Sequence, residues 1–304
     1  MKGLSYSGRA GRRGCHRDQG KQTGFTLIEL AVVVVVIGLL LTGILVPLSV
    51  QVETAKIQET QRKLAEIRSA LIGFAQVNGR LPCPATHATD GEELEAAGGA
   101  ARTCNDGVKS LQHGFVPAVT LGVSGPFNGD NLLVLVDAWG NPYRYSVTRF
   151  NLDAEEGWDF VADGEMRRVG MENLEPDLEV CSSEGPPPDD VTGTGSEVTP
   201  NCSDGGALAL TSQAPVVFYS LGPDGSNMPG YGFFSTYQLE NAGESAVIPS
   251  LLGGYWIAED DIFVAGPRRG EPDTDVARAY FDDIVEWISP VVLYERMIAA
   301  GQLP

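Results

Sequence analysis

The longest apolar stretch of the chain lies near its N-terminus. Residues 30–52 carry no charged side chain, and residues 30–46 are almost all aliphatic. A helix over residues 25–46 would be about 33 Å long, enough to cross the hydrocarbon core of a bilayer, which is about 30 Å thick. No small-residue cleavage site of the Ala-x-Ala kind follows it. The pattern therefore predicts a membrane-crossing helix rather than a removable secretory signal.

Beyond this stretch, apolar residues recur with the spacing of a helix that buries one face. They form a stripe of Leu64, Ile67, Leu71 and Phe74. Glu59 and Lys63 are spaced for an i, i+4 ion pair. Asn78-Gly79 supplies a stop signal, and the prolines that follow prevent the helix from resuming. We predict one helix over residues 25–77, whose second half packs its stripe against a globular body.

Short apolar or alternating runs bounded by Gly, Pro, Asn or Asp predict the strands of that body. These runs are residues 131–136, 143–148, 214–220, 261–264 and 284–288. The first two predict a hairpin. The last run also fits a helix, but its β-branched and aromatic residues favour a strand. Ser289-Pro290 predicts the start of a final helix that ends at Gly301.

Charge divides the chain into a basic head and an acidic body. Residues 1–24 hold six basic and one acidic side chain, and the remaining residues hold 15 basic and 39 acidic ones, which gives a net charge of −19. This balance excludes a protein that binds nucleic acid through a broad basic surface. The basic head should stay in the cytoplasm, which places the acidic body outside.

Four of the five cysteines lie in the acidic body, as expected for disulfides in an oxidising compartment. Cys83 and Cys104 are 21 residues apart, and so are Cys181 and Cys202. Sequential pairing is the simplest of the three possible connectivities. Two pairs of reduced, buried thiols are the alternative.

Residues 21–30, Lys-Gln-Thr-Gly-Phe-Thr-Leu-Ile-Glu-Leu, resemble the class III signal of type IV pilins and type II secretion pseudopilins. In that family a prepilin peptidase cuts after the glycine and methylates the new N-terminal phenylalanine. The resemblance implies cleavage between Gly24 and Phe25 and a role for Glu29 in assembly. Glu29 would pair with the new amine of its own chain or of a neighbour, and the alternative is a hydrated carboxylate at the bilayer interface.

Two later motifs resemble those of type II secretion major pseudopilins. Residues 137–145 match a hairpin motif of that family except at Ala138, where proline is usual. Residues 220–225, Ser-Leu-Gly-Pro-Asp-Gly, resemble a loop that holds calcium, which implies calcium as a cofactor and Asp224 as a ligand. A plain β-turn at Asp224 is the alternative. Further oxygens would come from Glu259, Asp260 and Asp261.

These features predict an α+β, pilin-like fold, with a long N-terminal transmembrane and stalk helix packed on a small antiparallel sheet. The expected parts are a cleaved cytoplasmic leader at residues 1–24, the helix at residues 25–79 and a periplasmic globular domain at residues 80–304. Two segments of this domain, residues 86–112 and 184–203, are predicted to be insertions because they are rich in small, charged or turn-forming residues.

Enzyme signatures are absent from the sequence. It contains no Gly-x-Ser-x-Gly elbow, His-Glu-x-x-His motif or phosphate-binding loop. His87 and His113 lie in or beside the first insertion, and neither has a recognisable catalytic partner. We therefore expect a protein that is not an enzyme.

The predicted function is structural: a minor subunit of a type II secretion pseudopilus or a type IV pilus. Its expected partners are a prepilin peptidase, other pilin or pseudopilin subunits and an inner-membrane assembly platform. Its expected location is the inner membrane, as a single-pass protein with a periplasmic domain, and then the fibre. The alternatives are a ligand-binding or adhesive minor pilin at a fibre tip and, less favoured, a signal-anchored periplasmic enzyme.

Overall fold

The computed structural model divides into two compact units, Met1–Val52 and Glu53–Pro304. It describes residues 24–94, 104, 111–127, 134–152, 158–184, 202, 208–225, 238, 241–242, 261–268 and 281–304, without the side chains of residues 40–49. Helix α1 (Leu27–Asn78) has 52 residues and begins in the first unit. The long helix predicted over residues 25–77 is thus confirmed.

The described part of the first unit is the N-terminal half of α1, with large apolar side chains exposed on all sides. Phe25 and Leu27 are 84% and 87% exposed, and the aliphatic residues from Val32 to Ile37 are exposed as well. Among the residues that the structure describes, no helix combines the length and the hydropathy needed to cross a membrane. The predicted membrane-crossing span is therefore not confirmed.

The second unit contains a four-stranded antiparallel sheet. Its strands are β1 (His113–Phe115), β2 (Arg144–Val147), β5 (Val216–Ser220) and β7 (Ile284–Ile288), in the spatial order β1-β2-β5-β7. Tyr145 of β2 lies opposite Phe218 of β5, which in turn lies opposite Glu286 of β7. This sheet is the antiparallel sheet that the sequence predicted.

A second sheet of three strands was not predicted. It consists of β3 (Leu178–Ser182), β4 (Ala209–Ala214) and β6 (Ile262–Ala265), in the order β4-β3-β6. The β3–β4 pair is antiparallel, but the β3–β6 pair is parallel. The fold therefore contains a mixed sheet in addition to the antiparallel sheet that was predicted. Parallel strands need a long crossover, and the chain between β3 and β6 runs through β4 and β5.

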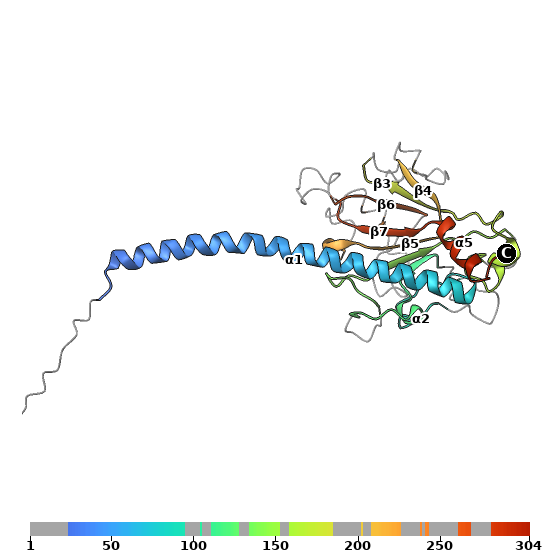
Figure 1. Ribbon diagram of the computed structural model, residues 1–304, viewed down its shortest axis with the longest axis horizontal. Coiled ribbons are helices and arrows are strands. Elements are labelled where there is room, and N and C mark those ends of the chain that lie inside the picture. The colour runs from blue at the N-terminus through green and yellow to red at the C-terminus, as the bar shows by residue number, and fades with distance from the viewer. Residues whose placement is uncertain are drawn as a thin grey trace, which may run out of the picture. The chain divides into compact units, whose positions relative to one another are not determined.

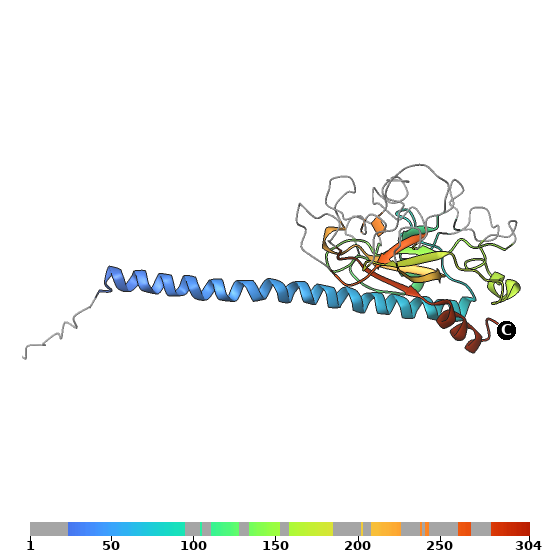
Figure 2. The ribbon, with the colours of Figure 1, turned by 90° about the horizontal axis from the view of Figure 1, so that it is seen from above.

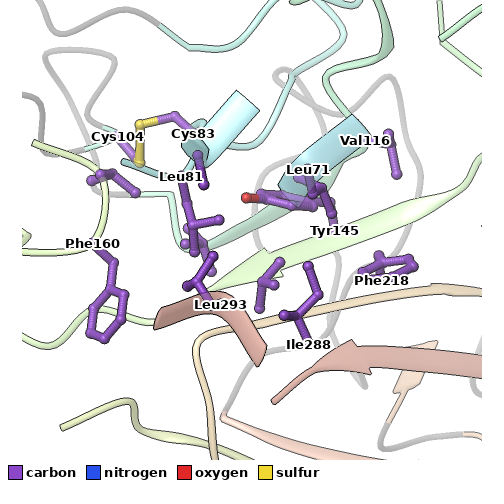
Figure 3. Packing of buried hydrophobic residues seen from close by; sticks show 14 of the residues in the cluster. Leu71, Leu81, Cys83, Cys104, Val116, Tyr145, Phe160, Phe218, Ile288 and Leu293 are labelled. Atoms are coloured by element: carbon purple, nitrogen blue, oxygen red, sulfur yellow. A yellow bond between two sulfur atoms is a disulfide. The ribbon is translucent and has the colours of Figure 1, made fainter. Parts of the chain in front are cut away.

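The four-stranded sheet lies between the second half of α1 and the second sheet (Figure 1). Alternate residues of a strand point to opposite faces, so β5 contributes to two cores. The core on the α1 side contains the buried helix residues together with Tyr145, Phe218 and Ile288, several of which are labelled in Figure 3. The core on the other side joins Val217 and Tyr219 to the second sheet, with Leu178, Val180 and Phe263.

The face of α1 that enters the core is close to the predicted stripe. Leu64, Ile67 and Leu71 are completely buried. Phe74 is only half-buried and instead lies under the Arg80 guanidinium, whose central carbon is 5.0 Å from the ring centroid. Lys63 was predicted to pair with Glu59 but instead forms an ion pair with Glu66, whose Oε2 lies 2.7 Å from Lys63 Nζ.

The C-terminal end of α1 is held by the C-terminus of the chain. Helix α5 (Pro290–Ala299) lies beside this end of α1 (Figure 2). Gln302 Nε2 donates hydrogen bonds to the carbonyl oxygens of Gln76 and Val77, at 3.1 and 3.0 Å. The last carbonyls of a helix have no partner within it, so Gln302 acts as a cap. The described residues also form the shorter helices α2 (Ala118–Leu121) and α3 (Glu165–Val169).

The strand predictions are partly confirmed. Strands β2, β5, β6 and β7 and helix α5 lie where the patterns predicted them. The predicted strand at residues 131–136 is described only from Val134, and there Leu135 and Val136 form isolated bridges rather than a strand. Strands β1, β3 and β4 were not predicted. The three-residue β1 and the largely exposed β4 show no clear alternation of apolar and polar residues.

The first predicted insertion is not simply a surface loop. Within its described residues, Leu94 and Leu111 are buried in the same core as Cys83 and Cys104. Of the second predicted insertion, the structure describes only Glu184 and Cys202.

Candidate functional site

The N-terminus of α1 is closed by a capping box. Glu29 Oε2 lies 3.4 Å from the backbone N–H of Thr26 and 3.3 Å from its hydroxyl, and the Glu29 N–H donates to Thr26 Oγ1 at 3.3 Å. This reciprocal Thr-x-x-Glu arrangement satisfies donors that a helix start leaves free. Gly24 and Phe25 precede it and are exposed. The spacing of Thr26 and Glu29 could have predicted this cap.

The Asp137–Pro142 segment forms a tight turn around one carboxylate. Asp137 Oδ1 accepts the backbone N–H groups of Trp139 and Asn141, at 2.9 and 2.8 Å. Gly140 adopts a φ of 92°, which favours glycine because a side chain would be strained there. The aspartate and the glycine of this motif are therefore explained by the geometry of the turn.

This turn contacts the second motif, residues 220–225, directly. The Ser220 hydroxyl donates to Asp137 Oδ2 at 2.6 Å, and Asn141 Nδ2 donates to the Gly222 carbonyl at 2.6 Å. All four residues are buried. The two motifs lie about eighty residues apart in the chain and form one hydrogen-bonded unit in the fold.

The same turn also contacts α1. The Ala138 N–H lies 3.5 Å from Thr60 Oγ1, and Trp139 Nε1 lies 3.4 Å from Glu53 Oε2. The other oxygen of Glu53 accepts a hydrogen bond from Arg268 at 2.9 Å. Trp139 is half-buried and contacts the helix through its indole N–H.

Asp224 lies in a cluster with two acidic residues that the sequence reasoning missed. Carboxylate oxygens of Asp224, Asp282 and Asp283 all lie within 4.8 Å of one another. Gln238 Nε2 bridges Asp224 and Asp282, at 2.9 and 2.6 Å. Asp282 and Asp283 directly precede β7, which pairs with the strand that leads to Asp224. Only the pairing of β5 with β7 brings these residues together.

Of the other predicted calcium ligands, only Asp261 lies among the described residues. Asp260 and Glu259 lie outside the described residues. Asp261 is described, and its carboxylate instead accepts a hydrogen bond from Gln112 and lies 3.9 Å from Arg149 Nη2.

The carboxylate cluster is buried and electrostatically strained. Burial, together with the charge of Asp282, raises the pKa of Asp224 to about 7. Burial and the charges of Asp282 and Asp224 also raise the pKa of Asp283 well above its usual value. Among the described residues, Oδ1 of Asp224 and Oδ1 of Asp283 have no hydrogen-bond partner. Hard divalent cations such as calcium are bound by oxygens of this kind.

The backbone at Gly222 is adapted to this cluster. Its φ is +69°, and a Cβ atom there would lie 2.9 Å from both the carbonyl oxygen and Oδ2 of Asp282. Any side chain at this position would therefore be strained and would collide with the cluster. The glycine of the Ser-Leu-Gly-Pro-Asp-Gly motif allows the loop to approach Asp282.

Two disulfides join Cys83 to Cys104 and Cys181 to Cys202, which are the pairs that the spacing predicted. Next to the first, Arg80 forms a bidentate pair with Glu93, at 2.8 Å for each bond. Glu93 also accepts the N–H of Cys83 at 3.1 Å. This buried ion pair fixes the start of the first disulfide loop.

His113 lies inside the protein and not at an accessible reactive site. Its Nδ1 is 2.9 Å from Ser146 Oγ, and both residues are buried. Burial, with a smaller effect of the nearby Arg149 charge, lowers the pKa of His113 to about 3. The imidazole is therefore neutral and shielded from solvent.

Comparison with known families identifies one segment. Residues 19–45 match the model of the prokaryotic N-terminal methylation motif, the class III signal of type IV pilins and pseudopilins. The motif indicates a pilin-like or pseudopilin-like protein that is processed at its N-terminus. No match was found among curated proteins or solved structures.

Proposed function

We propose that this chain is a structural subunit, and a minor one, of a type II secretion pseudopilus or a type IV pilus. The observation that carries the proposal is the methylation motif at residues 19–45, which covers the start of the 52-residue helix α1. The two pseudopilin-like motifs, which share hydrogen bonds across the fold, favour the secretion pseudopilus.

The exposed apolar half of α1 supports storage in a membrane followed by assembly. Side chains such as Phe25, Leu27 and Ile28 are more than 70% exposed, and exposing so many large apolar groups to water is unfavourable. Lipid of the inner membrane would cover them before assembly, and neighbouring subunits would cover them in the fibre. A prepilin peptidase and an assembly platform are the partners that this route requires.

Processing tests the proposal directly. Co-expression with a prepilin peptidase should give a mature chain that begins at an N-methylated Phe25, as measured by intact mass and N-terminal sequencing. Gly24→Val should block cleavage because the small residue before the cut is lost. Gly14→Val, the same change in the leader but outside the motif at residues 19–45, should leave cleavage intact. Assembled fibres in which the chain still carries its leader would contradict the proposal.

We also propose that Asp224, Asp282 and Asp283 hold a calcium ion. Support comes from the three convergent carboxylates and from Asp283, which is 96% buried and has an oxygen without a partner among the described residues. Bound calcium would supply the positive charge that offsets their mutual repulsion.

Calorimetric titration of the full chain in detergent, with calcium as the probe, tests this site. Asp283→Asn should weaken calcium binding at least about tenfold, because one charged ligand is lost. Asp90→Asn is a matched control, since Asp90 is exposed and lies in another loop. Equal affinity of Asp283→Asn and wild type would exclude Asp283 as a ligand.

A further inference from the structure

The loop at residues 220–225 belongs to two sites at once. On one side it carries Asp224, and its Gly222 lies against Asp282 so closely that a Cβ would be 2.9 Å from the carboxylate. On the other side, Ser220 and Gly222 form hydrogen bonds of 2.6 Å with the Asp137–Pro142 turn. The two sites share six consecutive residues, so a shift of this loop alters both.

The Asp137–Pro142 turn in turn connects the loop to α1. Its contacts with the helix are made at Thr60 and Glu53, through Ala138 and Trp139. Glu53 is the first charged residue after the uncharged residues 30–52. The turn therefore contacts α1 immediately after the long apolar stretch of the helix ends.

We propose that cation binding by the three aspartates controls how firmly the Asp137–Pro142 turn holds α1. This inference rests on the calcium site proposed above and assigns it a regulatory role. Three carboxylates within 4.8 Å repel one another when they are ionised and no cation is bound. Asp224 and Asp282 then move apart, and Gly222, packed against Asp282, moves with the loop. The hydrogen bonds to Asp137 and Asn141 weaken, and Ala138 and Trp139 release the helix.

Coupling of this kind is reciprocal. If cation binding strengthens the contact of the turn with α1, then weakening that contact must lower the affinity for the cation by the same factor. This reciprocity allows the coupling to be tested without mutating the three aspartates. Trp139→Phe removes the indole N–H that faces Glu53, and Trp139 is half-buried, so the change spares the core.

Hydrogen exchange of the full chain in detergent micelles, with calcium or with chelator, measures the coupling. In wild type, calcium should slow exchange about tenfold both in residues 220–225 and in residues 137–143. In Asn141→Ala, which lacks the bond to Gly222, only residues 220–225 should respond. Asn173→Ala is a matched control, because Asn173 bonds to Val169 in α3 and touches neither site.

The outcomes separate this inference from the calcium site itself. No calcium binding by wild type in calorimetry would overturn both. Calcium binding that protects residues 220–225 but not 137–143 in wild type would overturn the coupling alone, as would equal protection of 137–143 in wild type and Asn141→Ala. If Asn141→Ala does not fold, Trp139→Phe decides: binding about fivefold weaker supports the coupling, and unchanged affinity overturns it.

Discussion

The two halves of helix α1 differ in how their apolar side chains are covered. In the C-terminal half one stripe, including Leu64, Ile67 and Leu71, is completely buried against the sheet, and the opposite side is polar. In the N-terminal half the described apolar side chains are exposed, whichever way they point. A helix that buries one face folds with its own domain, whereas one that is apolar all round needs lipid or other subunits to cover it. The C-terminal half of α1 is therefore covered by its own domain, and the apolar surface of the N-terminal half is left to other contacts.

The largest expected effect comes from shortening a buried side chain in the C-terminal half. Leu71→Ala should lower the free energy of unfolding by about 2–5 kcal/mol, because it leaves a cavity in the core that also contains Tyr145 and Phe218. Val34→Ala, in the exposed half, should leave the unfolding of the globular unit unchanged. Denaturant titration of both variants in the same detergent makes the comparison. Equal destabilisation would show that both halves depend on the domain.

Removal of the first disulfide should have the next-largest effect on stability. The Cys83→Ala/Cys104→Ala double variant should lose about 3 kcal/mol of stability, because the link closes a loop of 21 residues in the unfolded chain. The measurement is denaturant unfolding with and without reductant, in which reductant should destabilise the wild type further than the variant. Processing at Gly24 should be unaffected, since that site lies in the other unit.

Stability should also depend on pH when calcium is removed. The pKa of Asp224 is raised from its usual 3.8 to about 7 in the folded chain. The folded state therefore holds more protons than the unfolded state between these values, so stability falls as pH rises through this window. Thermal melts in chelator should show a higher Tm at pH 5 than at pH 8. Asp224→Asn should reduce the difference, and calcium should raise the Tm at pH 8.

The smallest effect on stability, with a distinct effect on assembly, is expected at the capping box. Thr26→Ala should weaken the start of α1 by about 1 kcal/mol, and Thr26→Ser should restore the cap. Glu29→Ala removes the carboxylate and its half of the capping box, but the backbone N–H of residue 29 can still donate to Thr26 Oγ1. It should leave insertion and cleavage intact but impair entry into fibres, because an unpaired amine at Phe25 is costly in an apolar fibre core.

Comparison of membrane-bound and fibre-associated pools measures this last effect. An equal loss of fibre entry in Thr26→Ala and Glu29→Ala would show that the weakened helix cap causes the defect. Normal incorporation of Glu29→Ala would remove any assembly role for its charge.

The sequence by itself determined the features that depend on local pattern. Uninterrupted apolar residues, the stripe from Leu64 to Leu71 and the Asn78-Gly79 stop predict α1, because helix periodicity and end signals are encoded in neighbouring residues. The signal around Gly24 and Phe25 is likewise a contiguous motif. Sequential pairing of the four body cysteines, the simplest of three connectivities, is the pairing that the structure contains.

Only the tertiary structure decided which distant residues meet. The sequence led to Asp224, and Asp282 and Asp283 join it because β5 pairs with β7. The predicted partner Asp260 lies outside the described residues. The parallel β3–β6 pair and the contact of the Asp137 turn with both Ser220 and α1 also depend on strand order and crossover path. Such pairings are set by the burial of whole sheet faces, a property of the packed chain that no short stretch of sequence carries.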